Sequence, residues 1–330
     1  MTMTKPIRRV AVVGTGVIGA SWAALFLAKG LQVIATDPAP HAEVSLRQFV
    51  QAAWPALERL GLAPGASQAN LAFAAALGEA LVGVDFVQEN GPERLDFKQK
   101  LYGQLDALLP PDVIIASSSS GLPMSEMQKG AALHPERCVI GHPFNPPHVI
   151  PLVEIVGGNQ TSEETIRRAQ AFYGELGKRT VRLNKELPGH VANRLQAAVM
   201  REAYYLVSED VLSAADVDTA LSWGPGLRWG VMGAIMLNHL GGGPGGIEHF
   251  LNQFAGSLMT SWSNLGQPVL TPEVQKKVID GVHAEAGSRT IEDLEAERDD
   301  ILLGLIELRT RRQARTAQID EPGRDPDVGS

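Results

Sequence analysis

The feature that most constrains the fold of this chain is a glycine pattern close to its N-terminus. Residues 8–14, RRVAVVG, form a short β-rich run, and the run GTGVIG then places Gly14, Gly16 and Gly19 at the spacing G-x-G-x-x-G. In a dinucleotide-binding turn the first glycine permits the tight turn, the second lets the backbone approach a pyrophosphate, and the third lets the following helix pack closely. We therefore expect a strand, a glycine turn, and a helix whose N-terminus faces phosphate.

An acidic residue at the end of the next strand completes the pattern. The helix predicted over 17–30 is followed by LQVIATD, a strand over 31–37 that ends in Asp37. A carboxylate at this position can accept hydrogen bonds from both ribose hydroxyls and would repel a 2′-phosphate, which favours NAD over NADP. The residues that this unit predicts to bind NAD are Gly14, Gly16, Val17, Ile18, Gly19 and Asp37.

Strands and helices alternate along the first part of the chain. The stretch 41–81 reads as helical with a loop at 61–70, and another helix is expected to open at Pro92. Buried strands are expected at 84–90, 113–118, 138–143, 151–158 and 179–184. This alternation predicts an α/β fold, with a Rossmann-type, doubly wound, mostly parallel sheet followed by a smaller all-α domain.

The hydrophobic period becomes mostly helical after residue 187. We therefore expect an NAD-binding domain over 1–187, a helical substrate and dimerisation domain over 188–312, and a polar, disordered tail over 313–330. The glycine-rich run at 241–246 is expected to be a turn, because no strand precedes it and no Lys-Ser or Lys-Thr follows it.

The overall composition narrows the class of partner. The 330 residues carry a formal net charge of −8, which argues against nucleic acid or an anionic membrane as the main partner. No uncharged apolar run reaches the length of a membrane span, and the first residues contain no secretory h-region. The single cysteine, Cys138, lies in an apolar run and fits a buried side chain in a reducing compartment. We expect a cytoplasmic protein without nucleic-acid or membrane partners.

One histidine and one glutamate supply candidate proton chemistry. His142 stands at the end of a predicted strand, on the sheet edge where open α/β folds bind ligands. Glu154 lies within the apolar run PLVEIV, where burial without a partner would be costly. If the two strands lie side by side, the carboxylate can bond one ring nitrogen and stabilise the imidazolium form. A histidine suits this role because its unperturbed pKa is about 6.5.

Three further stretches, ASSSSG, GHPFNPPHVIPLVE and PGHVANRL, follow the glycine pattern in this order. Together the four resemble the 3-hydroxyacyl-CoA dehydrogenase family over about residues 7 to 240. The resemblance implies that His142 is the general base and that Glu154 orients it. It also implies that Ser120 and Asn193 are catalytic residues that contact the substrate hydroxyl. The residues that it adds to the NAD site are Glu93, Lys98, Ser120 and Asn145.

The chain departs from the family pattern at several positions. Ser119 stands where threonine is usual, His190 where phenylalanine is usual, and MGAIML replaces a glycine–proline with a following acid. Between Arg47 and Arg94 the only basic residue is Arg59, which is a poor clamp for the phosphates of coenzyme A.

The segment GPGLRWGVMG suggests another kind of substrate. It resembles a shorter, λ-crystallin-like subgroup that contains L-carnitine and L-gulonate 3-dehydrogenases. The guanidinium of Arg228 in this segment could bind a substrate carboxylate with two hydrogen bonds. An alternative for Arg228 is a surface or interface salt bridge.

These observations predict an NAD-dependent L-3-hydroxy acid dehydrogenase that acts on a small carboxylic acid, either carnitine-like or gulonate-like. His142, Ser120, Asn193 and Arg228 are the predicted substrate-binding residues. An L-3-hydroxyacyl-CoA dehydrogenase and a nucleotide-binding, crystallin-like protein without enzyme activity remain as alternatives. No metal is expected, and the resemblance implies a homodimer that pairs through the helical domain.

Overall fold

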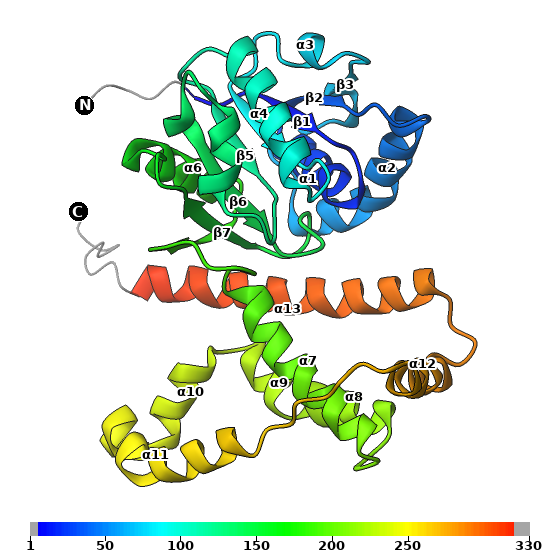
Figure 1. Ribbon diagram of the computed structural model, residues 1–330, viewed down its shortest axis with the longest axis vertical. Helices are drawn as coiled ribbons and strands as arrows, with labels where there is room; N and C mark the ends of the chain where they lie inside the picture. The colour runs from blue at the N-terminus through cyan, green and yellow to red at the C-terminus, as the bar shows by residue number, and fades with distance from the viewer. Residues whose placement is uncertain (1–5, 320–330) are drawn as a thin grey trace, which may run out of the picture. The chain divides into compact units, whose positions relative to one another are not determined.

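The computed structural model of this chain describes residues 6–319, and the side chains of residues 6–312. The chain divides into two compact units, residues 1–194 and 195–330. Figure 1 shows the strands in the first unit and helices alone in the second. The division falls after Arg194, whereas the change of period in the sequence placed it after residue 187.

The first unit is built on one sheet with the strand order β3-β2-β1-β4-β5-β6-β7-β8. All neighbouring strands are parallel except β6 and β7, which are antiparallel. This order confirms the predicted doubly wound, mostly parallel sheet. The strands are β1 (Arg9–Val13), β2 (Gln32–Thr36), β3 (Leu71–Phe73), β4 (Phe86–Glu89), β5 (Ile114–Ser117), β6 (Cys138–Pro143), β7 (Leu152–Gly157) and β8 (Arg179–Leu183).

Helices cover both faces of this sheet. Alternate residues of β1 enter different hydrophobic clusters, with Val10 and Val12 in one and Ala11 and Val13 in the other. Since successive strand residues point to opposite faces, each cluster is a core on one side of the sheet. The helices of this unit are α1 (Val17–Ala28), α2 (Ala42–Leu60), α3 (Leu77–Ala80), α4 (Leu95–Leu108), α5 (Met124–Met127) and α6 (Glu163–Glu175), with short 3₁₀ turns at Gln68–Asn70, Gln128–Gly130 and Pro135–Arg137.

Two elements of the first unit differ from the sequence prediction. The stretch expected to be helical beyond the 61–70 loop contains β3, whose three residues are held by parallel pairing with β2. The helix expected to open at Pro92 begins only at Leu95, because Arg94 has an extended backbone with φ −130°. Residues 92–94 are therefore available to contact a neighbouring loop.

The second unit consists of helices with little buried apolar surface of their own. Among its described residues the buried hydrophobic side chains are Val207, Ala214, Val217 and Leu303. Ser213 caps α8 by accepting the N–H of Asp216. The elements here are α7 (Ala192–Ser208), which begins in the first unit, α8 (Ala214–Trp223), α9 (Pro225–Trp229), α10 (Ala234–Gly241), η4 (Gly243–Gly245), α11 (Gly246–Ser263), α12 (Pro272–Ala286) and α13 (Ile291–Ile319).

The end of the described chain is helical. Helix α13 runs to Ile319, so the chain remains helical over residues 313–319, where the sequence predicted a disordered tail. The rest of that predicted tail, 320–330, lies outside the described residues. Of the helices in residues 6–319, none combines the length and apolar character that a membrane span requires.

Candidate active site

The glycine turn between β1 and α1 has the geometry that a dinucleotide site requires. Gly14 has φ +88°, and a Cβ added there would lie 2.8 Å from the backbone oxygen of Asn90. A Cβ added at Gly19 would lie 1.9 Å from the backbone oxygen of Gly14, so only glycine allows α1 to approach this closely. At Gly16, by contrast, an added Cβ would meet no atom within 4 Å. The backbone there borders open space at the N-terminus of α1, where a pyrophosphate is favoured.

The residues that flank this turn have different surroundings. Val17, the first residue of α1, is 63% exposed, whereas Ile18 packs partly into the core. Asp37 follows β2, and its carboxylate accepts the backbone N–H of Thr15 at 2.7 Å and of Ala39 at 2.8 Å. These bonds hold the carboxylate beside the glycine turn. The Thr15 hydroxyl also donates to Oδ2 at 3.3 Å, so about one of the four acceptor sites of a carboxylate is left for a ribose hydroxyl.

A buried histidine–glutamate pair lies at the end of β6. His142 and Glu154 are directly opposite each other in the antiparallel pairing of β6 with β7. Nδ1 of His142 lies 2.8 Å from Oε2 of Glu154, and the two residues are 5% and 1% exposed. The carboxylate can only accept, so Nδ1 carries the hydrogen and the neutral ring leaves Nε2 free to accept a proton. The sequence predicted this contact between the two strands.

The second oxygen of Glu154 holds the start of α7. Oε1 accepts the backbone N–H groups of Val191 at 2.8 Å and Ala192 at 3.0 Å. Burial raises the pKa of Glu154, but the hydrogen bonds from His142 and from these two N–H groups outweigh burial and hold it below its usual value. Glu154 is thus ionised at neutral pH. The same carboxylate fixes the imidazole and the backbone next to Asn193.

A second acidic residue, Glu93, holds the loop of residues 118–123 between β5 and α5, which we call the serine loop. Oε1 of Glu93 accepts the Ser119 hydroxyl at 2.7 Å, the Gly121 N–H at 2.7 Å and the Leu122 N–H at 3.2 Å. Between these anchored residues, Ser120 is exposed, and its hydroxyl makes no hydrogen bond to the described part of the chain. The loop is therefore fixed on both sides of a hydroxyl that is available to a ligand.

Lys98 does not present its ammonium group on the surface. Its Nζ lies 2.8 Å from Oε2 of Glu89, and the two side chains are 1% and 0% exposed. Glu89 also accepts the Ser117 hydroxyl at 2.7 Å. The family resemblance implied that Lys98 lies near the nicotinamide ribose. Its ammonium group lies in the buried ion pair with Glu89, which is joined to the end of β5 through Ser117, and its place in the NAD site stays a prediction.

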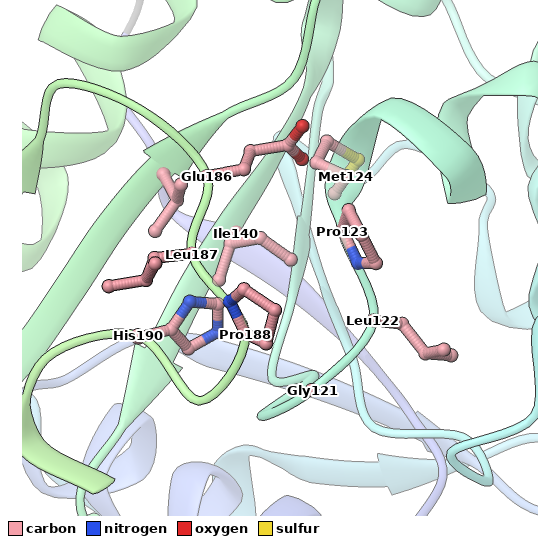
Figure 2. Close-up of a pocket in the computed structure, with 10 residues that line it drawn as sticks. Gly121, Leu122, Pro123, Met124, Ile140, Glu186, Leu187, Pro188 and His190 are labelled. Atoms are coloured by element: carbon pink, nitrogen blue, oxygen red, sulfur yellow. The ribbon is translucent and has the colours of Figure 1, made fainter. Parts of the chain in front are cut away.

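His190 packs against the ring of His142. Its ring centroid lies 4.8 Å from that of His142, and its Nε2 lies 3.0 Å from the backbone oxygen of Ser119. Burial lowers the pKa of His190 below its usual value. His190 also lines a cavity of about 150 Å³. Figure 2 shows His190 and Glu186 at opposite ends of this cavity, with Ile140 between them.

The remaining predicted site residues are spread over both units. Asn193 is the second residue of α7 and is half-buried, close to the backbone that Glu154 holds. Asn145 is exposed in the turn between β6 and β7. Arg228 is exposed on α9 of the helical unit. Within the first unit His142 and Glu154 are in direct contact, and Glu154 also holds the backbone next to Asn193. Glu93 holds the residues on both sides of Ser120.

Sequence reasoning missed two contributors to this site. Glu89 ends the buried strand β4 and binds Lys98, nine residues later, as well as Ser117. An acid at the end of an apolar run, followed by a lysine, was a signal for a buried pair. The contact of His190 with the Ser119 carbonyl had only the unusual residue type at position 190 as its signal, because the partner is a backbone atom 71 residues away.

Two family profiles match this chain in succession. The profile of the 3-hydroxyacyl-CoA dehydrogenase NAD binding domain matches residues 9–187, and that of the 3-hydroxyacyl-CoA dehydrogenase C-terminal domain matches residues 189–285. Among curated proteins, an L-carnitine dehydrogenase of Pseudomonas sp. is 48% identical over 91% of this chain and 94% of that protein. An L-carnitine dehydrogenase of Streptomyces coelicolor is 49% identical over the same shares of both chains.

Solved structures agree with these matches. An NAD⁺-dependent 5-formyl-3-hydroxy-2-methylpyridine 4-carboxylic acid 5-dehydrogenase superposes with a TM-score of 0.79 and 31% identity, covering 92% of this chain and 98% of its own. The 3-hydroxybutyryl-CoA dehydrogenase of Escherichia coli superposes with a TM-score of 0.60 and 28% identity, over 72% of this chain and 50% of that chain.

Proposed function

Because this chain belongs to the 3-hydroxyacyl-CoA dehydrogenase family, we propose that it oxidises the 3-hydroxyl of L-carnitine to the 3-keto acid. At the coarser level it is an NAD-dependent 3-hydroxy acid dehydrogenase. The observation that carries the chemistry is the 2.8 Å contact between His142 and Glu154 at the end of β6. The choice of carnitine rests on curated relatives that carry this name at 44–49% identity.

The proton step is assigned to the histidine–glutamate pair. Bound NAD⁺ supplies the hydride acceptor, held at the glycine turn and at Asp37. The lone pair on Nε2 of His142 takes the proton of the substrate hydroxyl, and the carboxylate of Glu154 stabilises the imidazolium that forms. The hydrogen bond at Nδ1 also fixes the ring orientation, so that Nε2 is the proton acceptor throughout.

The substrate hydroxyl needs partners besides the base. We assign this role to Ser120 and Asn193, because the hydroxyl of Ser120 is exposed and both residues lie beside anchored backbone. Arg228 is assigned to the substrate carboxylate, since a guanidinium binds a carboxylate with two hydrogen bonds. Glu93 supports the serine loop by accepting its hydrogen bonds. Lys98 supports it through the buried Glu89, which accepts the Ser117 hydroxyl at the end of β5.

A CoA thioester is the second candidate substrate. The solved 3-hydroxybutyryl-CoA dehydrogenase supports it through the shared fold. The sequence between Arg47 and Arg94 argues against it, because Arg59 is the only basic residue there to meet several phosphates. The buried contact between His142 and Glu154 argues against a crystallin-like role without enzyme activity. A protein that only binds a nucleotide at its glycine turn has no need of a histidine paired with a glutamate.

One panel of substrates separates these candidates. Initial rates of NADH formation are measured with L-carnitine, L-gulonate, L-3-hydroxybutyrate and L-3-hydroxybutyryl-CoA. We expect L-carnitine to have the highest kcat/KM. A preference for the thioester would assign the protein to acyl-CoA oxidation. A preference for gulonate would make gulonate, rather than carnitine, the proposed substrate. If no substrate gave NADH, the crystallin-like role would be favoured.

A homodimer in the cytoplasm completes the proposal. Large apolar side chains of the helical unit are exposed, including Trp223 at 78% and Ile235 at 80%. A monomer rarely exposes so much apolar surface. The commonest way to bury it is pairing with the same surface of a second copy, because two-fold symmetric dimers are the most frequent oligomers. The cytoplasmic location is supported by a single cysteine, which is buried and unpaired.

A further inference from the structure

We propose that His190 is a positioning residue that fixes the serine loop against the catalytic histidine. This proposal rests on the proposed dehydrogenase function. It adds His190, which stands where phenylalanine is usual in the family pattern, to the residues of the site. Its side chain is 4% exposed and reaches from the start of the α7 segment to the loop after β5. The ring of His142 lies on one side of it, and the backbone of Ser119 lies at its edge.

The hydrogen bond to Ser119 determines which nitrogen of His190 carries hydrogen. A carbonyl oxygen can only accept, so Nε2 donates to it at 3.0 Å. In the neutral ring Nδ1 is then an unprotonated acceptor, and this atom is buried with no partner among the described residues. Protonation would place a charge on this buried edge. The groups whose charges act on His190 are His142, Glu154 and Glu93.

Two contacts hold Ser119, one through its hydroxyl and one through its backbone carbonyl. Glu93 accepts its hydroxyl at 2.7 Å, and His190 donates to its carbonyl at 3.0 Å. Glu93 also holds the N–H groups of Gly121 and Leu122, on the far side of Ser120. Ser120 thus lies between fixed neighbours while its own hydroxyl is exposed. Without His190 the loop keeps its hydrogen bonds to the exposed Glu93. It loses the hydrogen bond to the Ser119 carbonyl, which comes from a ring that packs on His142.

The ring of His190 has a second consequence for the reaction. When His142 takes the substrate proton it becomes positively charged, and a second charged ring 4.8 Å away would oppose this. Burial keeps His190 neutral, so the ring fills space beside His142 without adding charge. A phenylalanine would fill the same space, but it could not donate to Ser119. The donor is therefore the property that distinguishes histidine at this position.

Two substitutions separate the ring from the donor. His190→Phe keeps an aromatic ring and removes the donor, whereas His190→Gln removes the ring and keeps an amide N–H that can reach the carbonyl. Net loss of one hydrogen bond corresponds to about tenfold in rate. We expect His190→Phe to lower kcat about tenfold with little change in KM for NAD⁺. We expect His190→Gln to restore most of the loss. His134→Gln, at a partly exposed histidine away from this loop, is the matched control and should leave kcat unchanged.

A double-variant comparison tests whether His190 acts through Ser120. If it does, His190→Phe in a Ser120→Ala background should cause less than about a twofold further loss of kcat, because coupled residues are not additive. Losses that multiply, a wild-type kcat in His190→Phe, or a Gln variant no better than the Phe variant would each overturn the proposal.

Hydrogen exchange gives a readout that needs no substrate. His190→Phe should speed amide exchange of Gly121 and Leu122 relative to the His134→Gln control. Unchanged exchange would overturn the proposal even if no 3-hydroxy acid is oxidised, so its failure is distinct from failure of the proposed function. If His190→Phe does not fold, the same comparison is made with His190→Gln, whose retained donor should keep exchange at the wild-type rate; faster exchange would then count against the proposal.

Discussion

The two units of this protein bury their apolar residues very differently. In the NAD-binding unit, Phe86 is 0% exposed and packs on α6, and the His142–Glu154 pair is buried at the end of β6. In the helical unit, Trp223 and Ile235 are 78% and 80% exposed, and few side chains are fully buried. The first unit therefore has an extensive core of its own, whereas the second exposes large apolar side chains, for which we propose a second copy of the chain as the partner.

This difference also separates the chemical roles that we propose. The first unit holds its polar groups in fixed positions, because each buried carboxylate has several donors. The helical unit contributes Arg228, which is exposed on a short helix. We thus propose that proton transfer takes place at the sheet edge and that an exposed arginine of the helical unit recognises the substrate carboxylate.

The largest effect should come from the base itself. His142→Gln keeps a side chain of similar size but removes the proton acceptor, and we expect kcat to fall by about 10²–10⁴-fold. NADH binding, measured by fluorescence titration, should stay near the wild-type value because the glycine turn is untouched. Wild-type turnover in a folded variant would remove His142 from the mechanism.

Removing a buried aromatic ring tests how much the core of the first unit contributes to stability. Phe86 packs on Phe172, with ring centroids 4.4 Å apart. Phe86→Ala should lower the free energy of unfolding by about 3–5 kcal/mol in urea denaturation. The control is Val44→Ala on the exposed side of α2, where we expect a change within about 0.5 kcal/mol. Equal effects of the two substitutions would contradict the described core.

Arg228 tests the role of the helical unit in substrate binding. Arg228→Ala should raise KM for L-carnitine about ten- to hundredfold, because it removes charge-assisted hydrogen bonds to a carboxylate. Arg228→Lys keeps the positive charge but lacks the planar guanidinium that binds a carboxylate with two hydrogen bonds. Its KM for L-carnitine should lie between those of the wild type and of Arg228→Ala. An unchanged KM for free acids would instead favour the CoA thioester as substrate.

Trp223 tests the exposed apolar surface. Trp223→Asp should weaken a dimer about thirtyfold or more, as expected for an aromatic side chain at the centre of an interface. Sedimentation velocity at several concentrations measures the change, with Trp223→Phe as the control that keeps an apolar ring. A wild-type protein that is monomeric at all concentrations would refute the dimer.

Acid stability should provide the smallest contrast between the units. Burial raises the pKa of Asp106, but the Leu133 N–H and the Arg137 guanidinium outweigh it and hold that pKa below its usual value. A folded-state pKa below the unfolded one stabilises the fold above the unfolded pKa, and this is lost as pH falls through the folded pKa. Urea denaturation between about pH 3 and 7 should therefore show less pH dependence for Asp106→Asn. The backbone and hydroxyl of Thr290 also lower the pKa of Asp293, but this carboxylate is exposed at the start of α13 and screened by solvent, so Asp293→Asn should change the profile less than Asp106→Asn.

The sequence predicted the parts of this structure that depend on local pattern. The glycine turn and the alternation of strands and helices follow from spacing and hydrophobic period. The buried Glu154 pointed to a partner, and the antiparallel register placed His142 opposite it. The short connection between Pro143 and Leu152 also favours an antiparallel pairing, because parallel strands need a crossover of about a dozen residues or more. What the pattern could not supply was the register that sets His142 opposite Glu154.

The missed features depend on distant contacts. Strand β3 has only three residues and exists because β2 offers an edge to pair with. Helix α4 starts late, and Glu93 before it contacts the serine loop, 26 to 29 residues further along the chain. The contact of His190 with a backbone carbonyl likewise leaves no pattern of side chains to read.

The transfer of hydrogen from C3 of carnitine tests the central claim most directly. The protein is mixed with NAD⁺ and L-carnitine that carries deuterium at C3, and the reduced cofactor is examined by mass spectrometry. We predict one deuterium in the reduced cofactor and a 3-keto product, with both absent in His142→Gln over the same time. Unlabelled cofactor, or turnover that is equally fast in His142→Gln, would contradict the account.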